Sequence, residues 1–174
     1  MNNFNQNNLL ELFYDQYKNQ IPNENFLYSL KTSADTFSWQ DTFHNILKLA
    51  DELSLYIKKN DRCLLISENR PEWFISDFAI MLSETITVPA YTTYAERDYE
   101  YIINDCKPSV VFVSNIEQFK KIKNIIKKKD FVKKIFSFEK LNELNIDEYI
   151  DTNNLILNFK NNNFKKILKR KDAA

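Results

Sequence analysis

Few side chains in this sequence have the types and spacing that catalysis requires. The 174 residues include one histidine, His44, two cysteines, Cys63 and Cys106, and no glycine, although average usage of about 7% would give roughly twelve glycines. Loops that cradle phosphates use glycine because backbone N–H groups can then converge on the anion without a Cβ in the way. The sequence therefore excludes a P-loop, a dinucleotide-binding fingerprint and a G-x-S-x-G nucleophile elbow.

The remaining acid–base candidates have no evident partners. His44 lies beside Phe43 in a segment of helical periodicity, and neither a cleft nor a partner for a general base is visible around it. We interpret it as a solvated or partly buried helix residue. Asp98, Glu100 and Asp105 could act as paired carboxylates, but acidic residues on the exposed face of a short helix are commoner. Both groups are therefore interpreted as structural.

The two cysteines predict an intracellular, reducing environment. Cys63 and Cys106 lie in apolar contexts without metal-ligand spacing, so buried free thiols in the cytoplasm are expected. Residues 1–8 are polar and uncharged, unlike a signal peptide. The hydrophobic stretches are much shorter than the ~20 residues of a transmembrane helix. A cytoplasmic protein without a transmembrane segment is the prediction.

Lysines are concentrated in the second half of the chain. Eight lie between Lys120 and Lys134, and six further basic residues lie between Lys160 and Lys171. Such runs could meet phosphates of nucleic acid or lipid. The first run, however, interleaves with Ile122, Ile126 and other apolar residues at helical spacing, and no arginine fork or aromatic platform accompanies it. We interpret it as the wet face of a packed helix, and the net charge of zero gives no general case for nucleic acid.

The most distinctive polar block is Asn69–Trp73 (NRPEW). It follows an apolar strand-like run and precedes a helix, which is where open α/β sheets place ligands. The competing interpretation is a strand-to-helix turn in which Trp73 anchors the start of the helix. Physical arguments alone favour the anchor.

Periodicity predicts the elements that position these residues. Ser38 and Asp41 form a capping box before a helix, Asn69 and Pro71 open another, and Asn115 caps a third. A hairpin is expected over 26–31 and 36–38, with further helices over 9–17 and 96–104. Apolar runs predict strands over Arg62–Ser67, Ile86–Tyr91, Ser109–Ser114 and Lys134–Phe138. Pro89 places the second of these at a sheet edge or strand end.

Short apolar strands that alternate with amphipathic helices define the expected fold class. It is α/β, a partial doubly wound and mostly parallel sheet with helices on both faces. With 44% hydrophobic and 14% aromatic residues, the chain can fill a sizeable core. The pattern dissolves near Tyr149, so we expect one subdomain over 1–149 and an Asn/Lys-rich tail over 150–174.

An ordered series of blocks resembles the start of the long-chain acyl-CoA synthetases of the adenylate-forming superfamily. Asn60–Trp73 (NDRCLLISENRPEW) resembles the family's "GDRV-strand-SENRPEW" block, and Thr87–Tyr94 (TVPAYTTY) resembles its "VPLYPT" turn. The other matching blocks are Thr36–Trp39 (TFSW), Ser76–Ile80 (SDFAI) and Tyr101–Pro108 (YIINDCKP). The resemblance covers roughly residues 10–140 and implies the N-terminal part of the adenylate-forming fold.

The chain departs from the family where the family has glycine. Asn60 stands in place of one glycine, and Ser83–Thr85 stands in place of a glycine-containing turn. If those glycines have positive φ, asparagine adapts to it, but Glu84 or Thr85 would be strained by roughly 1 kcal/mol.

The resemblance implies that the complete family protein activates a fatty acid with ATP and Mg²⁺ to an acyl-adenylate, and then transfers the acyl group to CoA. In the family, the phosphate loop, the adenine-contacting motif, the magnesium-holding glutamate, the CoA site and the C-terminal domain all follow the matched region. No catalytic, cofactor-binding or metal-binding residue is therefore carried over. We expect a fragment that is inactive alone and binds no ATP, Mg²⁺ or CoA.

Two other interpretations stay open. The chain could be a non-catalytic binding or assembly module built on the same scaffold, or a stand-alone enzyme of unrelated chemistry. The expected partners are the remainder of a synthetase, or a second copy bound through an exposed sheet edge. Neither nucleic acid nor a membrane span is expected.

Overall fold

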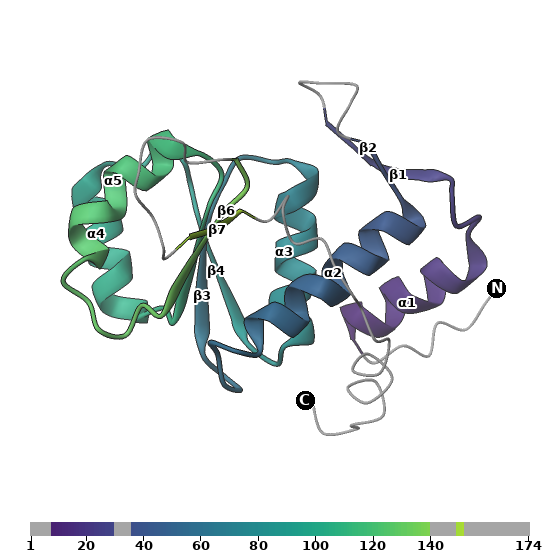
Figure 1. Ribbon diagram of the computed structural model, residues 1–174, viewed down its shortest axis with the longest axis horizontal. Helices are drawn as coiled ribbons and strands as arrows, with labels where there is room; N and C mark the ends of the chain where they lie inside the picture. The colour runs from purple at the N-terminus through teal and green to yellow at the C-terminus, as the bar shows by residue number, and fades with distance from the viewer. Residues whose placement is uncertain (1–7, 30–35, 140–148, 152–174) are drawn as a thin grey trace.

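The computed structural model describes residues 8–29, 36–139 and 149–151 (Figure 1). Its centre is a parallel five-stranded sheet with the order β4-β3-β5-β6-β7. The strands are β3 (Arg62–Ile66), β4 (Ile86–Ala90), β5 (Val110–Val113), β6 (Lys134–Ser137) and β7 (Tyr149–Asp151). Every adjacent pair in this sheet is parallel, in agreement with the predicted, mostly parallel sheet, and β7 is a strand that was not predicted.

Helices cover both faces of the sheet, which confirms the doubly wound α/β class. One face carries α2 (Trp39–Leu53) and α3 (Pro71–Leu82), and the other carries α4 (Glu96–Cys106) and α5 (Ile116–Ile126) (Figure 1). Side chains of β3 alternate between the two cores: Cys63 and Leu65 face α2 and α3, whereas Leu64 and Ile66 face α4 and α5. The four residues of β5 are fully buried because the strand is covered on both faces.

A smaller aromatic layer lies outside α2 and α3. It contains α1 (Leu9–Asn19) and the antiparallel pair β1 (Asn25–Tyr28) and β2 (Thr36–Ser38). Phe26 stacks on Trp39 with ring centroids 3.8 Å apart, and Phe13 lies 4.9 Å from the Phe78 ring. The antiparallel pairing of the predicted hairpin is confirmed, and its turn lies outside the described residues.

All three predicted helix starts are confirmed in position, and two of them have the predicted side-chain caps. The Asp41 N–H donates to Ser38 Oγ at 3.0 Å, and the Gln118 N–H donates to Asn115 Oδ1 at 3.1 Å. At the third, α3 begins at Pro71 as predicted, but Arg70 and not Asn69 is the N-cap, and no side chain caps the helix. Pro71 has no N–H to satisfy, and the carboxylate of Glu72 complements the positive end of the helix dipole.

Three turns at the amino ends of the strands contain residues with left-handed backbone. Asn60, with φ 67°, precedes β3; Glu84, with φ 58°, precedes β4; and Lys107, with φ 46°, precedes β5. The first two are the positions where the family resemblance led us to expect displaced glycines. Lys107 was not predicted; it is the αL residue that ends α4. For residues with a Cβ this conformation costs roughly 1–2 kcal/mol.

Asp61 joins the turns at the amino ends of the strands through its carboxylate and its backbone carbonyl. Asp61 Oδ2 accepts hydrogen bonds from the Lys58 N–H at 3.0 Å and from Ser109 Oγ at 2.9 Å, and lies 3.6 Å from Lys133 Nζ. The Asp61 carbonyl accepts from the Ile86 N–H at 2.9 Å. Burial raises the pKa of the Asp61 carboxyl, but the hydrogen bonds from Lys58 and Ser109 and the charge of Lys133 outweigh it and leave the pKa lowered.

The β4 edge of the sheet is poorly suited to pairing with another strand. The backbone N–H and C=O groups of successive residues in a strand point to opposite sides. The Ile86 N–H points toward β3, so the backbone groups of Val88 and Ala90 also point toward β3, whereas those of Thr87 and Pro89 point outward. Proline has no N–H, so one outward donor is missing. The predicted edge position of this strand is confirmed, and the predicted self-association through a sheet edge is disfavoured at β4.

The predicted boundary between residues 149 and 150 falls within β7, whose residues pair with β6. Residues 152–174, most of the predicted tail, lie outside the described residues, so the division of the chain stays a prediction. Within 8–29, 36–139 and 149–151, no helix is long and apolar enough to cross a membrane.

Replacing Glu84 tests the backbone strain. Glu84→Gly and Glu84→Ala both remove the partly exposed Lys59–Glu84 ion pair, so the difference in stability between the two variants isolates the backbone. We expect the glycine variant to be more stable than the alanine variant by about 1 kcal/mol, measured by urea unfolding. The control is Asn104 in α4, where glycine should be about 1 kcal/mol worse than alanine. Equal stabilities of the two Glu84 variants would contradict the strain.

The Asp61 tie predicts a pH-dependent contribution to stability. Since the pKa of Asp61 is lower in the folded than in the unfolded chain, its contribution is present above the unfolded pKa of about 3.9 and is lost as pH falls through the folded value. Asp61→Asn should cost about 1 kcal/mol near neutral pH, and the gap to wild type should shrink below about pH 4. Urea midpoints across this range measure it. Exposed Asp105→Asn is the control, and a gap at Asp61 that does not vary with pH would exclude the mechanism.

Candidate functional site

The topology identifies one position where a sheet of this class offers a ligand crevice. From β3 the chain crosses to β4 through α3, whereas from β5 it crosses to β6 through α5 on the opposite face. Strand order reverses between β3 and β5, and ligands of open α/β sheets bind outside the carboxyl ends of the strands at such a point. The distinctive block Asn69–Trp73 follows β3 at this end of the sheet.

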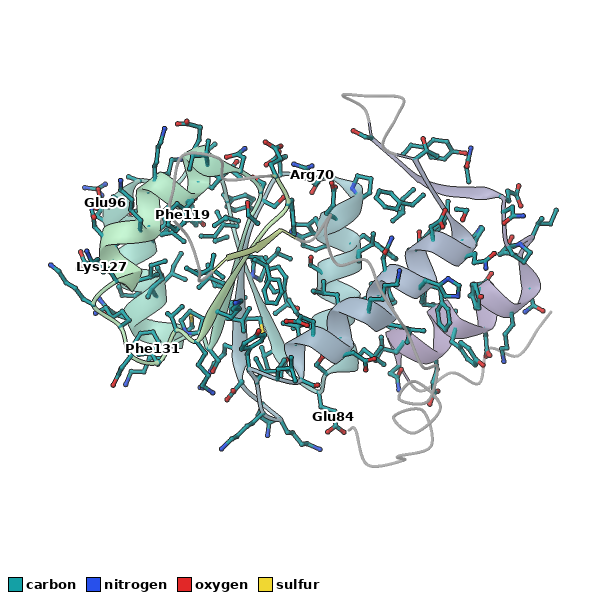
Figure 2. The ribbon with its side chains drawn as sticks, in the orientation of Figure 1. Arg70, Glu84, Glu96, Phe119, Lys127 and Phe131 are labelled. Atoms are coloured by element: carbon teal, nitrogen blue, oxygen red, sulfur yellow. The ribbon has the colours of Figure 1, made fainter. Side chains whose placement is uncertain are left out.

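The guanidinium of Arg70 occupies this position (Figure 2). It makes a two-pronged contact with Glu72, from Nε to Oε2 at 2.9 Å and from Nη2 to Oε1 at 2.8 Å. Nη1 donates to Glu139 Oε1 at 2.9 Å and lies 3.7 Å from Glu68 Oε1. The guanidinium carbon lies 5.6 Å from the centroid of the Phe138 ring. Arg70 thus reaches from the end of β3 past β5 to residues that follow β6.

The guanidinium of Arg70 donates its hydrogen bonds to carboxylates of the same chain. Burial lowers the pKa of Arg70, but hydrogen bonds and attraction to Glu72 and Glu139 outweigh it, so the pKa is raised and the side chain stays charged. One guanidinium surrounded by three carboxylates has a net negative charge. A phosphate that bound Arg70 would have to displace one carboxylate and would be repelled by the other two, so the site does not favour an anion. The arrangement instead links α3 to the end of β6.

Trp73 has a supporting role in the same turn. It is half-buried and packs against the core formed by α2 and α3, in agreement with the anchor interpretation. The specific polar contacts of the block, however, come from Arg70 and Glu72.

Ser114 is a further polar residue at the switch point. It follows β5, and its N–H donates to the Ile66 carbonyl at 3.0 Å. Its side chain is fully buried, and within the described part of the chain Oγ has no hydrogen-bond partner. A buried hydroxyl without a partner costs free energy, but a single hydroxyl does not define a chemistry.

A second set of contacts braces the turn between β4 and α4. Tyr99 Oη donates to the Tyr91 carbonyl at 2.7 Å, and Lys121 Nζ donates to the Thr92 carbonyl at 2.6 Å. Burial raises the pKa of Tyr99 to about 12, so the phenol stays protonated. Lys121, part of the predicted lysine run, therefore serves the fold in this region.

The remaining candidates from the sequence are not brought together. His44 is half-buried on α2, with its ring 6.4 Å from that of Phe43. Asp98 Oδ2 accepts the Ala95 N–H at 3.0 Å at the start of α4, whereas Glu100 and Asp105 are exposed. These positions agree with the structural interpretation of each residue.

The cysteines are separate free thiols. Cys63 is buried, as predicted, and Cys106 is only half-buried, because it lies in the last turn of α4. Burial raises the pKa of the Cys63 thiol to about 12 and also raises that of Cys106, so neither is an activated nucleophile. Among the described residues, no three His, Cys, Asp or Glu side chains are placed to hold a metal ion.

Sequence reasoning missed Glu139 and Ser114. Both follow apolar strands, and in a parallel sheet all such residues lie at the carboxyl edge. Their positions after predicted strands could have placed both residues at the carboxyl edge of the sheet, but they do not reveal which side chains contact one another.

Solved structures that share this arrangement of sheet and helices include two ligases. Anthranilate CoA ligase AuaEII in complex with anthranoyl-AMP superposes with a TM-score of 0.70 over 84% of this chain and 26% of its own, at 19% identity. A mutant coronafacic acid ligase from Pectobacterium brasiliense gives a TM-score of 0.71 over 82% of this chain and 27% of its own, at 17% identity. These similarities establish the fold.

The sequence matches the AMP-binding enzyme family over residues 14–172, and the chain belongs to that family. Fatty acyl-CoA synthetase A of Dictyostelium discoideum is 30% identical over 107 residues, which are 60% of this chain and 15% of that protein. Long chain acyl-CoA synthetase 4 of Arabidopsis thaliana is 28% identical over 102 residues, or 58% of this chain and 15% of its own. The match thus spans about 15% of the length of these relatives.

Replacing Arg70 tests its role as a link. Arg70→Ala leaves Glu72, which is buried, without its partner and should lower the free energy of unfolding by about 3 kcal/mol. Arg70→Lys keeps the charge but loses the two-pronged geometry, so an intermediate loss is expected. The control Arg97→Ala removes a side chain that is 89% exposed and should change stability by less than about 0.5 kcal/mol. Urea unfolding measures all three, and wild-type stability of Arg70→Ala would contradict the role.

Proposed function

We propose that this chain contributes the N-terminal scaffold of an AMP-dependent long-chain fatty acid–CoA ligase and is inactive alone. The family match over residues 14–172, with fatty acyl-CoA and long-chain acyl-CoA synthetases among the relatives, supports this assignment. The observation that carries the scaffold role is the Arg70 cluster, which fills the switch point of the sheet with internal ion pairs.

In the complete ligase, ATP and Mg²⁺ would activate a fatty acid to its acyl-adenylate, and CoA would accept the acyl group. These ligands would be held by segments outside the matched 15% of the relatives, since a glycine-free chain offers no glycine-containing phosphate loop. The partner of this scaffold is then the remainder of the synthetase. Two free cysteines without a disulfide support a cytoplasmic location.

ATP–Mg²⁺ should leave the melting temperature of the 174-residue chain unchanged. A ligand at about 100 times its Kd stabilises a protein by about 2.7 kcal/mol, which corresponds to roughly 5–10 °C for a domain of this size. Differential scanning fluorimetry across an ATP–Mg²⁺ titration would reveal such a shift, with Mg²⁺ alone as the control. A saturable rise would show that the chain carries its own nucleotide site.

The coding sequence beyond Ala174 supplies the complementary test. A Ser/Thr/Gly-rich loop followed by lysine in any forward frame would identify the missing phosphate-binding part. The corresponding extended protein should then convert a long-chain fatty acid, ATP and CoA to acyl-CoA, whereas the 174-residue chain should not. Without such a loop, an assembly module on the same scaffold becomes the better assignment.

A further inference from the structure

The net charge of zero conceals a polarised molecule. Among the described residues around the carboxyl ends of the strands, acidic side chains outnumber the cations: Glu68, Glu72, Glu96, Asp98, Glu117 and Glu139 accompany Arg70, Arg97, Lys120 and Lys121. The turns at the amino ends carry the opposite excess. We define the basic face as the exposed or half-exposed cations of those turns: Lys58, Lys59, Arg62, Lys107, Lys127, Lys128, Lys129 and Lys133.

The basic face is one continuous surface because backbone and side-chain contacts join its four turns. Asp61 binds Ser109 of the α4–β5 turn and Lys133 of the α5–β6 turn. The Asn60 N–H donates to the Glu84 carbonyl at 2.9 Å, which adds the α3–β4 turn. The Lys133 N–H donates to the Ser109 carbonyl at 2.8 Å. Cations from segments far apart in the sequence are therefore held together at one end of the sheet.

Acidic residues on this face neutralise only part of its charge. Asp61 pairs with Lys133, and Glu84 lies 3.8 Å from Lys59. Asp105 and Asp130 are exposed nearby, and Asp51 and Glu52 are half-buried in the last turn of α2 beside Leu55. Lys58, Lys127 and Lys128 are exposed and form no ion pair with another described residue, so an excess of positive charge faces solvent.

Apolar side chains are exposed among these cations. Leu55, in the turn that follows α2, is 71% exposed, and Ile86, at the start of β4, is 49% exposed. Phe131 and Val132, in the α5–β6 turn, are half-buried beside the lysines. Figure 2 shows Phe131 and Glu84 toward the lower end of the sheet and Arg70 toward the upper end. Lysines interspersed with exposed aliphatic groups are the composition of a surface that rests on lipid headgroups.

We propose that the basic face docks the protein on an anionic lipid bilayer. The lysines would attract acidic headgroups, and Leu55 and Ile86 would enter the boundary between headgroups and acyl chains. The surface consists of side chains on several turns and does not depend on whether the chain is part of a ligase. With no net charge on the whole protein, attraction depends on orientation, so this end of the sheet would face the membrane.

The chemistry of the face favours lipid over nucleic acid. All but one of its cations are lysines, which act as point charges, and Arg62 is the only guanidinium among them. The exposed aromatic residues in the described part of the chain, Tyr28, Tyr91 and Tyr101, belong to other elements and provide no stacking platform on this face. Aliphatic Leu55 and Ile86 have no role in binding phosphates of a nucleic acid.

Sedimentation with vesicles tests the proposal on the full 174-residue chain. We expect binding to phosphatidylcholine vesicles that contain phosphatidylserine and none to phosphatidylcholine alone. Binding should weaken steeply as salt rises from about 0.1 to 1 M, since the screening length falls from about 10 to 3 Å. Absence of binding to the phosphatidylserine vesicles at low salt would overturn the proposal.

Charge variants locate the surface. Each lysine near an anionic membrane contributes about fivefold to binding, so Lys58→Gln/Lys127→Gln/Lys128→Gln should weaken partitioning about a hundredfold. The matched control, Lys18→Gln/Lys48→Gln/Lys120→Gln, removes the same charge from other parts of α1, α2 and α5 and should weaken it by less than about fivefold. Melting temperatures of both variants check that they fold. Equal losses in the two variants would mean a general charge effect and would exclude docking by this face.

The apolar contribution has its own matched pair. Leu55→Ser should weaken vesicle binding about tenfold, because a partly buried leucine gains roughly that factor from transfer out of water. Ile21→Ser, at a residue 68% exposed in the turn between α1 and β1, should not change it. Unchanged vesicle binding of Leu55→Ser would show that Leu55 does not insert into the membrane. Tighter binding of the wild type to a single-stranded RNA, lost in the lysine variant of the face, would assign the surface to nucleic acid.

Discussion

The carboxylate of Asp61 holds the amino ends of three parallel strands together, and much of the structure depends on that tie. It receives donors from the turn before β3, from Ser109 before β5 and from Lys133 before β6. Turns drawn this close must reverse direction within few residues. Asn60, next to Asp61, has left-handed backbone in one of these turns. In a chain without glycine, the fold accepts this backbone cost in exchange for the register of its central sheet.

The two ends of the sheet differ in their polar contacts. At the amino ends, short turns and a shared carboxylate align the strands, and the cations of those turns are left facing solvent. At the carboxyl ends, where related folds have space for a ligand, Arg70 closes the gap between β3 and β6 with carboxylates on both sides. The carboxyl ends of the strands are thus tied together by ion pairs, whereas the amino ends present a charged surface to solvent.

Much of the architecture could be predicted from the sequence because its signals are local. Apolar runs such as Val110–Val113, the Ser38–Asp41 capping box and the Asn115 cap each specify structure within a few residues, and they define the alternation of strands and helices. The family resemblance added the positions of Asn60 and Glu84. Contacts between distant segments were not predictable in this way. Arg70 meets Glu139 across 69 positions, and Asp61 meets Ser109 across 48, distances over which composition and periodicity carry no information. Lys107 was missed because αL backbone at a lysine has no propensity signal.

The outward register of Pro89 has a consequence for the order in which the ribosome delivers the strands. β3 and β4 emerge before β5, and the nascent pair has two open sides. On the β4 side, Pro89 withholds a donor, so an added strand from another nascent chain would pair poorly. On the β3 side every residue has its N–H, and this is the side that β5 joins when it is synthesised. During synthesis the sheet therefore grows more readily on the β3 side, where the next strand of the same polypeptide is added.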